Sequence, residues 1–265
     1  MIIFPASKIN LGLKICGKRP DGYHDLKSIF CPLELSDILE IIPSNKFEFS
    51  QSGIPVDGDQ KDNIIIKAYE LLKSKFDLEP VKIHLHKVVP LGAGLGGGSA
   101  NGTACLKLLN TLFDLKLSKD QLLNFALELG SDCPFFVESK LAYVEGRGER
   151  LRSIEHTFSN FYIKLINPGI HISTAQAFKG IPINTAATLN EAILQKTADW
   201  KNEFVNDFEK TVFPLYPELE SIKKQLYSEG AFYASLSGTG STVYGIFKEE
   251  PSPSFPQYFE WIHRL

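Results

Sequence analysis

The sequence contains no apolar run that approaches the roughly 18 residues needed to span a membrane. It also lacks a surplus of basic residues, because 28 lysines and arginines stand against 31 acidic residues and the net charge is −3. Nucleic-acid-binding domains usually carry such a surplus. We therefore expect neither a nucleic-acid partner nor a membrane partner.

The four cysteines lack the Cys-x-x-Cys spacing that is typical of metal and redox sites. They lie apart, in apolar or strand-like segments, at Cys16, Cys31, Cys105 and Cys133. We interpret them as small core residues of a protein in a reducing compartment. The opening residues Met-Ile-Ile-Phe-Pro lack the charge pattern of a signal peptide, so the expected location is the cytoplasm.

A chain of 265 residues can form one large domain or two medium ones. Strand and helix patterns are mixed without strict alternation, which predicts an α+β fold rather than a doubly wound sheet. The polar, charged segment 147–160 is the best candidate for a boundary. The predicted domains are therefore residues 1–152 and 153–265.

Hydrophobic periodicity predicts the individual strands and helices. The expected strands are residues 9–15, 26–35, 38–42, 81–85, 161–166, 231–235 and 242–247. The expected helices are residues 64–76, a helix from the glycine-rich segment to Leu112, a helix from the Ser118–Gln121 capping box to Gly130, and stretches near 174–180, 189–195 and 217–228. Residues 50–62 and 145–152 are polar or charged and are expected to be a loop and a turn.

Five of the seven residues from Gly92 to Gly98 are glycine. Glycine lets bare backbone N–H groups approach an anion. Here the glycines follow a predicted strand and open a predicted helix, whose unpaired N–H groups and dipole would point at the loop. We therefore predict a phosphate site, with a flexible linker as the alternative. The loop has neither the Gly-Lys-Ser/Thr ending of a Walker A motif nor the glycine spacing of the dinucleotide fingerprint.

Three polar residues could supply chemistry beside this loop. Asp132 is flanked by Cys133 and Phe135, so we expect a partly buried carboxylate that needs a partner; a turn or capping role is the alternative. Strand alternation puts Lys8 and Asn10 on one face, where each alone would be a solvated residue. Together the three suit phosphoryl transfer, with the Asp accepting a hydroxyl proton while the Lys orients it and offsets negative charge.

Two further patterns are less specific. Residues Ser235–Ser241 form a small-residue loop between two predicted strands. It is either a tight hairpin or a second segment that approaches a phosphate closely. His84 and His86 have the spacing of a metal pair, but no third ligand is evident, so metal ligands stay unassigned.

Taken together, these motifs resemble the GHMP kinases, a family that includes galactokinase and the homoserine and mevalonate kinases. Pro90–Ala104 is similar to the second motif of the family, and Ser237–Gly240 is similar to the third. Pro5–Leu11 followed by Arg19–His24 resembles the branch that acts on 4-diphosphocytidyl-2-C-methyl-D-erythritol. Segments 129–136, 145–149 and 206–209 also resemble that branch, and the likeness extends from about residue 4 to about residue 247.

The resemblance implies a two-domain fold, with an N-terminal ATP-binding α/β domain of a type also found in a ribosomal protein and a C-terminal ferredoxin-like domain. It implies that ATP and Mg²⁺ are used to phosphorylate the 2-hydroxyl of this cytidine diphosphate methylerythritol, in the non-mevalonate isoprenoid precursor pathway, by a monomer or a homodimer. One rival is another kinase of the family, such as homoserine or mevalonate kinase, although Arg19–His24 argues against it because those substrates have no cytosine. The other rival is a nucleotide-binding protein without catalysis.

The resemblance also implies residue roles. Asp132 would be the catalytic base and Lys8 its companion. The substrate would be held by Asn10, Tyr23, His24, Thr174 and Phe178, with the cytosine stacked by Tyr23 and Phe178 and hydrogen-bonded by His24. The predicted ATP-binding residues are Asn63, Pro90, Gly92, Gly94, Leu95, Gly96, Gly97, Gly98, Ser99, Asn101, Gly238 and Thr239.

Three residues depart from the family pattern. Ala100 stands where a second Ser is frequent, which removes one hydroxyl near the phosphates or Mg²⁺. Gly102 stands where Ala is usual, which weakens the helix start by about 1 kcal/mol. Ser131 replaces a frequent Ala beside Asp132.

Overall fold

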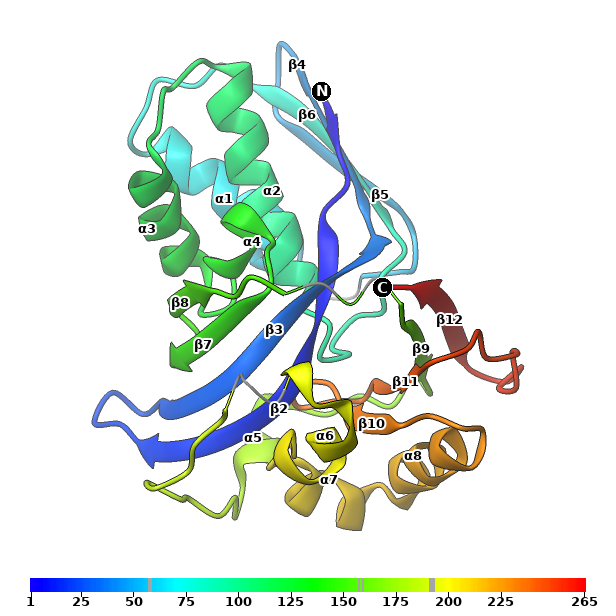
Figure 1. The fold of residues 1–265 in the computed structure, drawn as a ribbon. Helices are drawn as coiled ribbons and strands as arrows, with labels where there is room; N and C mark the ends of the chain where they lie inside the picture. Colours follow the sequence, from blue (N-terminus) through cyan, green and yellow to red (C-terminus); the bar gives the residue numbers. More distant parts are fainter. Residues whose placement is uncertain (57–58, 157, 159, 191–193) are drawn as a thin grey trace. The chain divides into compact units, whose positions relative to one another are not determined.

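The computed structural model describes residues 1–56, 59–156, 158, 160–190 and 194–265, and Figure 1 shows the order of its elements. The chain forms two compact units that interleave along the sequence. Unit 1 comprises Met1–Lys8, Pro32–Leu91 and Gly96–Lys140, and unit 2 comprises Ile9–Cys31, Gly92–Leu95 and Leu141–Leu265. This division differs from a cut at residue 152, because β2 (Ala6–Lys18) and β3 (His24–Ser36) each contribute to both units. The domains 1–152 and 153–265 stay a prediction.

One layer of unit 1 is a four-stranded sheet in the order β1-β4-β6-β5. Its strands are β1 (Ile2–Ile3), β4 (Ile38–Pro43), β6 (Val81–Lys87) and β5 (Glu48–Gly53). The pairs are antiparallel except β5–β6, which is parallel. Strand β5 corrects the loop that was expected from residue 50 onward. Apart from Phe49, which packs against the core, its residues are polar or glycine and largely exposed, so no hydrophobic alternation marks it, and backbone pairing with β6 holds it instead.

The helices of unit 1 cover one face of this sheet (Figure 1). They are α1 (Ile64–Lys73), α2 (Gly97–Leu112), α3 (Lys119–Leu129) and the single turn α4 (Phe135–Glu138), with the short 3₁₀ helix η1 (Gln60–Asp62) before α1. Leu39 and Ile83 of the sheet share a buried core with Leu109 of α2. The predicted capping box is confirmed, since the Ser118 hydroxyl accepts from the Gln121 N–H and the Gln121 side chain accepts from the Ser118 N–H.

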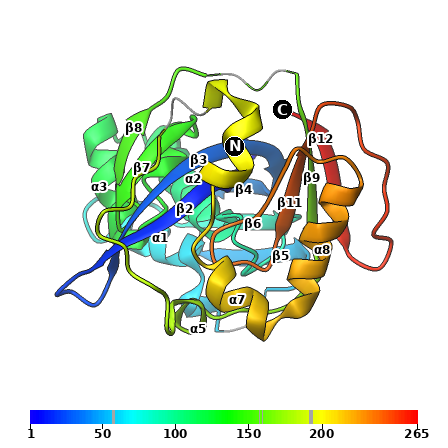
Figure 2. The same ribbon diagram turned by 60° about the horizontal axis from the view of Figure 1, so that its bottom comes forward.

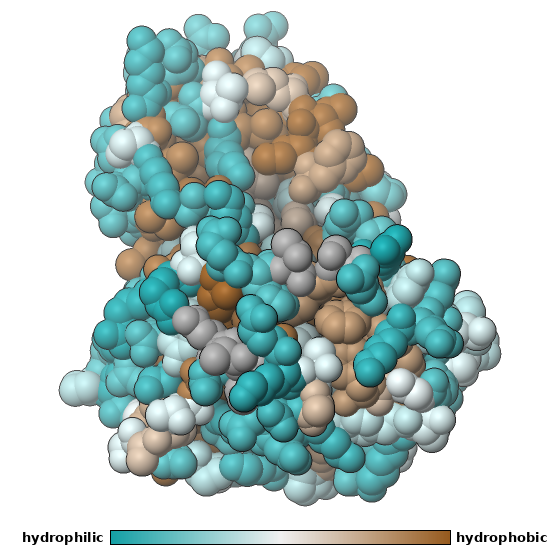
Figure 3. All heavy atoms as spheres, in the orientation of Figure 1, coloured by the Kyte–Doolittle hydropathy of each residue, from teal (hydrophilic) through white to brown (hydrophobic). Residues whose placement is uncertain are grey.

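The opposite face of this sheet carries several exposed apolar side chains. Figure 3 shows apolar residues gathered on the part of unit 1 that bears the N-terminus and β4. The exposed apolar residues of this region are Ile2, Phe4, Ile38 and Ile42. No helix within the described residues is long and apolar enough to cross a membrane.

Unit 2 contains an antiparallel sheet in the order β10-β11-β9-β12. Its strands are β9 (Tyr162–Asn167), β10 (Tyr233–Leu236), β11 (Val243–Phe247) and β12 (Phe259–Arg264). Its helices are α5 (Thr174–Phe178), α6 (Trp200–Glu203), α7 (Glu209–Leu215) and α8 (Pro217–Ser228), with the 3₁₀ helix η3 (Thr197–Asp199) before α6. Figure 2 shows α7 and α8 beside this sheet, where Val212 and Leu226 join its core.

A third sheet has the order β2-β3-β7-β8, with β7 (Ala142–Gly146) and β8 (Arg150–Ser153). The turn expected at 145–152 is confirmed at residues 147–149 only, because β7 extends to Gly146 and β8 begins at Arg150, where the backbone is paired. The helix expected near 189–195 includes residues 191–193, which lie outside the described residues. The mixture of helices and strands confirms the α+β class.

Candidate active site

Lys8 and Asp132 form an ion pair inside unit 1, with 3.5 Å between Lys8 Nζ and Asp132 Oδ2. The Lys8 side chain is 4% exposed and the Asp132 side chain 33%. The alternative that Lys8 is a solvated strand residue is therefore wrong. Lys8 is the partner that a partly buried Asp132 carboxylate was expected to need. Burial lowers the pKa of Lys8, and the Asp132 charge opposes that shift. A base and a cation are thus held together, with the base partly open to solvent.

The turn that carries Asp132 is fixed to helix α2. Gly130 ends α3, and the next residues form a turn before α4. The Thr103 hydroxyl of α2 donates to the Cys133 carbonyl at 2.9 Å. The buried Cys133 thiol, whose pKa burial raises to about 11, also bonds to the Ser99 side chain. Asp132 therefore lies at a defined position beside the first turn of α2.

The glycine-rich segment approaches Lys8 closely at Gly96, which is the N-cap of α2 and has φ of +68°. A Cβ on Gly96 would lie 2.8 Å from Phe136 Cζ and 3.2 Å from Lys8 Cε. Only glycine fits both the left-handed backbone and this contact. The predicted helix after the glycines is confirmed as α2, and its N-cap residue Gly96 lies close to the Lys8 side chain.

The first half of the glycine segment belongs to unit 2, where it meets the loop between β10 and β11. The Ser237 hydroxyl donates to the Gly94 carbonyl at 2.8 Å, and a Cβ on Gly94 would lie 1.8 Å from the Ser237 carbonyl oxygen. Asn206 holds this loop by donating to the Leu236 and Gly238 carbonyls, both at 2.8 Å. The loop is therefore both a hairpin connection and a close neighbour of Gly94.

Unit 1 also has a pocket of about 560 Å³, within the size range of ligand sites. Four of the predicted ATP-binding residues line it: Asn63, Gly98, Ser99 and Asn101. Leu85, Lys87, Phe49 and Gln51 line it too and were not predicted. The last two lie on β5, whose polar sequence carries no strand signal. The other predicted ATP-binding residues do not line this pocket: Pro90, Gly92, Gly94, Leu95, Gly96 and Gly97 lie along the glycine segment, and Gly238 and Thr239 lie in unit 2.

Asn101 offers a free acceptor at this pocket. Its side chain is 2% exposed, and among the described residues its Oδ1 has no hydrogen-bond partner. A buried acceptor without a partner is costly, so it indicates a ligand. Mg²⁺ prefers oxygen ligands and usually takes few from the protein and several from phosphates and water. Asn101 and Ser99 fit that chemistry, and no group of three His, Cys, Asp or Glu that could hold a metal is found in the described ranges.

The residues predicted to hold cytosine lie in unit 2. His24 and Phe178 stack, with ring centroids 4.4 Å apart and an angle of 18° between the rings. Tyr23 is 50% exposed, and the Arg147 guanidinium lies 4.9 Å from its ring centroid. Thr174 is exposed at the start of α5, one turn before Phe178. The structure thus places His24, rather than Tyr23, directly against Phe178.

Asn10 is buried in unit 2 rather than solvated. Its Nδ2 donates to the Ser28 hydroxyl at 2.9 Å, and its backbone carbonyl accepts from the Tyr244 hydroxyl at 2.6 Å. A Cβ on Gly238 would lie 3.5 Å from Asn10 Oδ1. The amide is therefore fixed beside the Gly238 backbone.

The two histidines of β6 have a local explanation. His84 bonds to the Ser50 and Ser52 hydroxyls of β5, and His86 bonds to Ser52, at distances of 2.8–3.0 Å. Both lie on the outer side of the β5–β6 pair. They tie an edge strand to its neighbour, which accounts for the His-x-His spacing.

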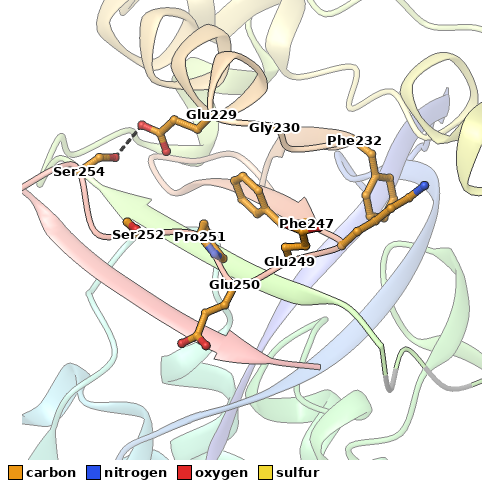
Figure 4. A pocket seen from close by; sticks show the side chains of 10 residues that line it. Glu229, Gly230, Phe232, Phe247, Glu249, Glu250, Pro251, Ser252 and Ser254 are labelled. Atoms are coloured by element: carbon orange, nitrogen blue, oxygen red, sulfur yellow. Dashed lines mark hydrogen bonds between the residues drawn. The ribbon is translucent and has the colours of Figure 1, made fainter.

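A second pocket, of about 720 Å³, lies in unit 2 (Figure 4). Phe232 and Phe247 line it, and Glu229 accepts a 2.6 Å hydrogen bond from the Ser254 hydroxyl at its rim. None of the predicted site residues lines this pocket. It carries no part of the chemistry described above.

A lysine–carboxylate pair close to a glycine-rich helix N-terminus, in a unit with a pocket of about 560 Å³, fits the chemistry of a small-molecule kinase. Comparison with known proteins gives the same class. The sequence model described as "GHMP kinases N terminal domain" matches residues 63–140, and the one described as "GHMP kinases C terminal" matches residues 178–255.

Relatives that match over almost the whole chain identify one branch of this family. A 4-diphosphocytidyl-2-C-methyl-D-erythritol kinase of Azobacteroides pseudotrichonymphae is 47% identical over 255 residues, covering 96% of each chain. One of Bacteroides fragilis is also 47% identical and covers 94% of this chain and 93% of its own. A crystal structure of 4-(cytidine 5'-diphospho)-2C-methyl-D-erythritol kinase superposes with a TM-score of 0.77 at 28% identity, over 92% of this chain and 89% of that one. The chain belongs to the GHMP kinases and, within them, to the 4-diphosphocytidyl-2-C-methyl-D-erythritol kinase family.

Proposed function

We propose that this protein transfers the γ-phosphoryl group of ATP to the 2-hydroxyl of 4-diphosphocytidyl-2-C-methyl-D-erythritol. The observation that carries the proposal is the contact between the Lys8–Asp132 pair and Gly96 at the start of α2. Phosphoryl transfer requires a base for the hydroxyl and positive charge for the developing phosphate oxygens. Unit 1 supplies both within one small region.

In this proposal Asp132 accepts the hydroxyl proton as the substrate oxygen attacks the γ-phosphorus. The bond from the γ-phosphorus to its bridging oxygen breaks, ADP leaves, and the product is a phosphate monoester. Lys8 orients Asp132 through their ion pair, and its ammonium offsets negative charge that builds up during transfer. Backbone N–H groups at the start of α2 receive the phosphates.

ATP is assigned to the pocket lined by Asn63, Ser99 and Asn101. Bound Mg²⁺ would neutralise phosphate charge, with Asn101 Oδ1 and the Ser99 hydroxyl as the oxygen donors of this chain. Ala100 supplies no hydroxyl, whereas Asn101, the next residue, offers an Oδ1 without a hydrogen-bond partner among the described residues.

The cytidine group is assigned to the aromatic residues Tyr23, His24 and Phe178, with Thr174 at the start of the same helix as Phe178. The Tyr23 ring is exposed, so a planar base can stack on it. Such stacking is worth about 1–3 kcal/mol per base. Burial and then the Lys18 charge lower the pKa of His24, so its imidazole is neutral near pH 7 and can hydrogen-bond a neutral base.

The proposal is tested by incubating the protein with ATP, Mg²⁺ and the cytidyl substrate and identifying the product by mass spectrometry and phosphorus NMR. We expect one added phosphate on the 2-position and one ADP per product. The Asp132→Asn variant is the control for traces of other kinases. Phosphate transfer to another position, or equal product from wild type and variant, contradicts the proposal.

A further inference from the structure

Asp37 and Lys87 form a second, fully buried ion pair in unit 1. Lys87 Nζ lies 2.7 Å from Asp37 Oδ2, and the two side chains are 1% and 0% exposed. Burial lowers the pKa of Lys87, and the charge of Asp37 opposes this shift. Neither residue belongs to a motif that the sequence singled out.

The pair binds the backbone immediately before the glycine-rich segment. Asp37 Oδ1 accepts from the N–H groups of Val88 and Val89, at 2.7 and 2.8 Å. Lys87 Nζ donates to the Val89 carbonyl at 2.6 Å. Three backbone polar groups of the segment that leaves β6 are therefore held by one buried pair, just before Pro90.

The same pair supports the start of α2. A Cβ on Gly97, the first residue of that helix, would lie 3.1 Å from both Lys87 Nζ and Val89 Cγ1. Lys87 also lines the proposed nucleotide pocket together with Ser99 and Asn101. Both ends of the glycine-rich segment are thus in contact with structure that Asp37 fixes.

Stability alone is a poor explanation for this pair. Replacing a buried ion pair with apolar residues of similar volume is often neutral or stabilising. The Val88 and Val89 N–H groups, unlike the two charges, cannot be replaced with apolar groups. A buried N–H that loses its acceptor has no other group to bond. The specific contribution of Asp37 is therefore the acceptor that it gives to Val88 and Val89.

We propose that Asp37 is a positioning residue for nucleotide binding, which sets the glycine-rich segment and the start of α2 through Val88, Val89 and Lys87. This inference rests on the proposed function in assigning ATP to the unit 1 pocket. It names a residue that touches neither ATP nor the acceptor. It predicts an effect on ATP affinity that is separate from any effect on stability.

Two double variants separate the effect of the hydrogen-bond acceptor at position 37 from the effect of the two charges. The amide variant, Asp37→Asn/Lys87→Met, removes both charges and retains an Oδ1 acceptor for the two N–H groups. The leucine variant, Asp37→Leu/Lys87→Met, removes the same charges and the acceptor. Should the leucine variant fail to fold, Asp37→Val/Lys87→Met replaces it, because valine is smaller and still supplies no acceptor.

The readouts are the dissociation constant for ATP by calorimetry, the melting temperature, and KM for the cytidyl substrate. We expect the leucine variant to bind ATP at least about tenfold more weakly, the cost of an unpaired buried N–H. We expect the amide variant to bind ATP at least about tenfold more tightly than the leucine variant, because the two share the loss of Lys87 from the pocket lining and differ only in the acceptor for Val88 and Val89. We expect KM for the cytidyl substrate to stay unchanged in both.

The matched control is Lys164→Met in unit 2. Lys164 is also fully buried and lies 2.8 Å from Glu229 and 3.0 Å from Glu260, and it does not line the proposed nucleotide pocket. It should lower the melting temperature and leave ATP affinity unchanged. Wild-type ATP affinity in the leucine variant, or equal losses in both double variants, would overturn the inference. Calorimetry with ATP alone needs no turnover, so this result is independent of whether the proposed reaction occurs.

Discussion

The rings of His24 and Phe178 stack nearly in parallel, with 4.4 Å between their centroids, although Pro32–Leu91 and Gly96–Lys140 of unit 1 lie between the two residues in sequence. The contact joins the first residue of β3 to the last residue of α5. It leaves the Tyr23 ring exposed on the other side, with Arg147 over it. A planar base therefore has an aromatic surface to bind, formed from two distant segments of the same unit.

Replacing Tyr23 with Ala should weaken binding of the cytidyl substrate much more than binding of ATP. Loss of one stacking face, worth about 1–3 kcal/mol, corresponds to a rise in KM of roughly 5- to 150-fold. Steady-state kinetics with each substrate varied in turn measures the split. Tyr23→Phe keeps the ring and should stay near wild type, whereas an equal loss of both affinities would indicate a folding defect and refute the stacking role.

Asp132→Asn should abolish turnover while ATP still binds. The amide keeps the shape of the side chain but cannot accept a proton, and a positioned base contributes about 10²- to 10⁴-fold. Single-turnover kinetics measures the chemical step, and calorimetry checks nucleotide binding. Unchanged turnover would remove Asp132 from its role.

The pH dependence of kcat should report Lys8. Burial lowers the pKa of this group below its ordinary 10.5, so its ammonium loses its proton earlier as pH rises. The rate should therefore fall on the alkaline side at a pH below 10.5. Lys8→Arg keeps its charge at such pH and should be slower but flat there. The same alkaline fall in both proteins would assign it to another group.

Gly96→Ala should damage both the pair and the loop. A left-handed backbone costs an L-residue about 1–2 kcal/mol, and the new Cβ would press on Phe136 and Lys8. We expect a lower melting temperature and a loss of kcat. Gly98→Ala is the matched control, because a Cβ there has no neighbour within 4 Å. An equal fall in melting temperature for both variants would contradict this account.

The parts of the fold that the sequence predicted are those with a strong local signal. The capping box at Ser118, the glycine break before α2 and the alternation along β6 each depend on residues close in sequence. Strands β5, β8 and β12 were missed because their side chains are largely polar, charged or only partly buried. Strand β7 was missed because it is short and runs into a charged turn, across which it pairs with β8. Strands β5 and β12 pair only with segments far along the chain, which no local pattern reports.

The residues of the candidate site likewise differ in how far the sequence could predict them. Asp132 and Lys8 could be suggested from their motifs, but their 3.5 Å contact depends on the tertiary fold. Asp37 and Lys87 had no signal, since a single Asp between strands and a single Lys at a strand end look like surface residues. Only their burial and the bonds to Val88 and Val89 reveal them.

The most direct test of the central claim is ADP release by the purified protein with ATP, Mg²⁺ and 4-diphosphocytidyl-2-C-methyl-D-erythritol, run beside homoserine and mevalonate. The account predicts release with the cytidyl substrate alone. Release only with homoserine or mevalonate would retain a kinase but contradict the roles of Tyr23, His24 and Phe178. No release with any acceptor, in protein that binds ATP, would contradict the catalytic claim itself.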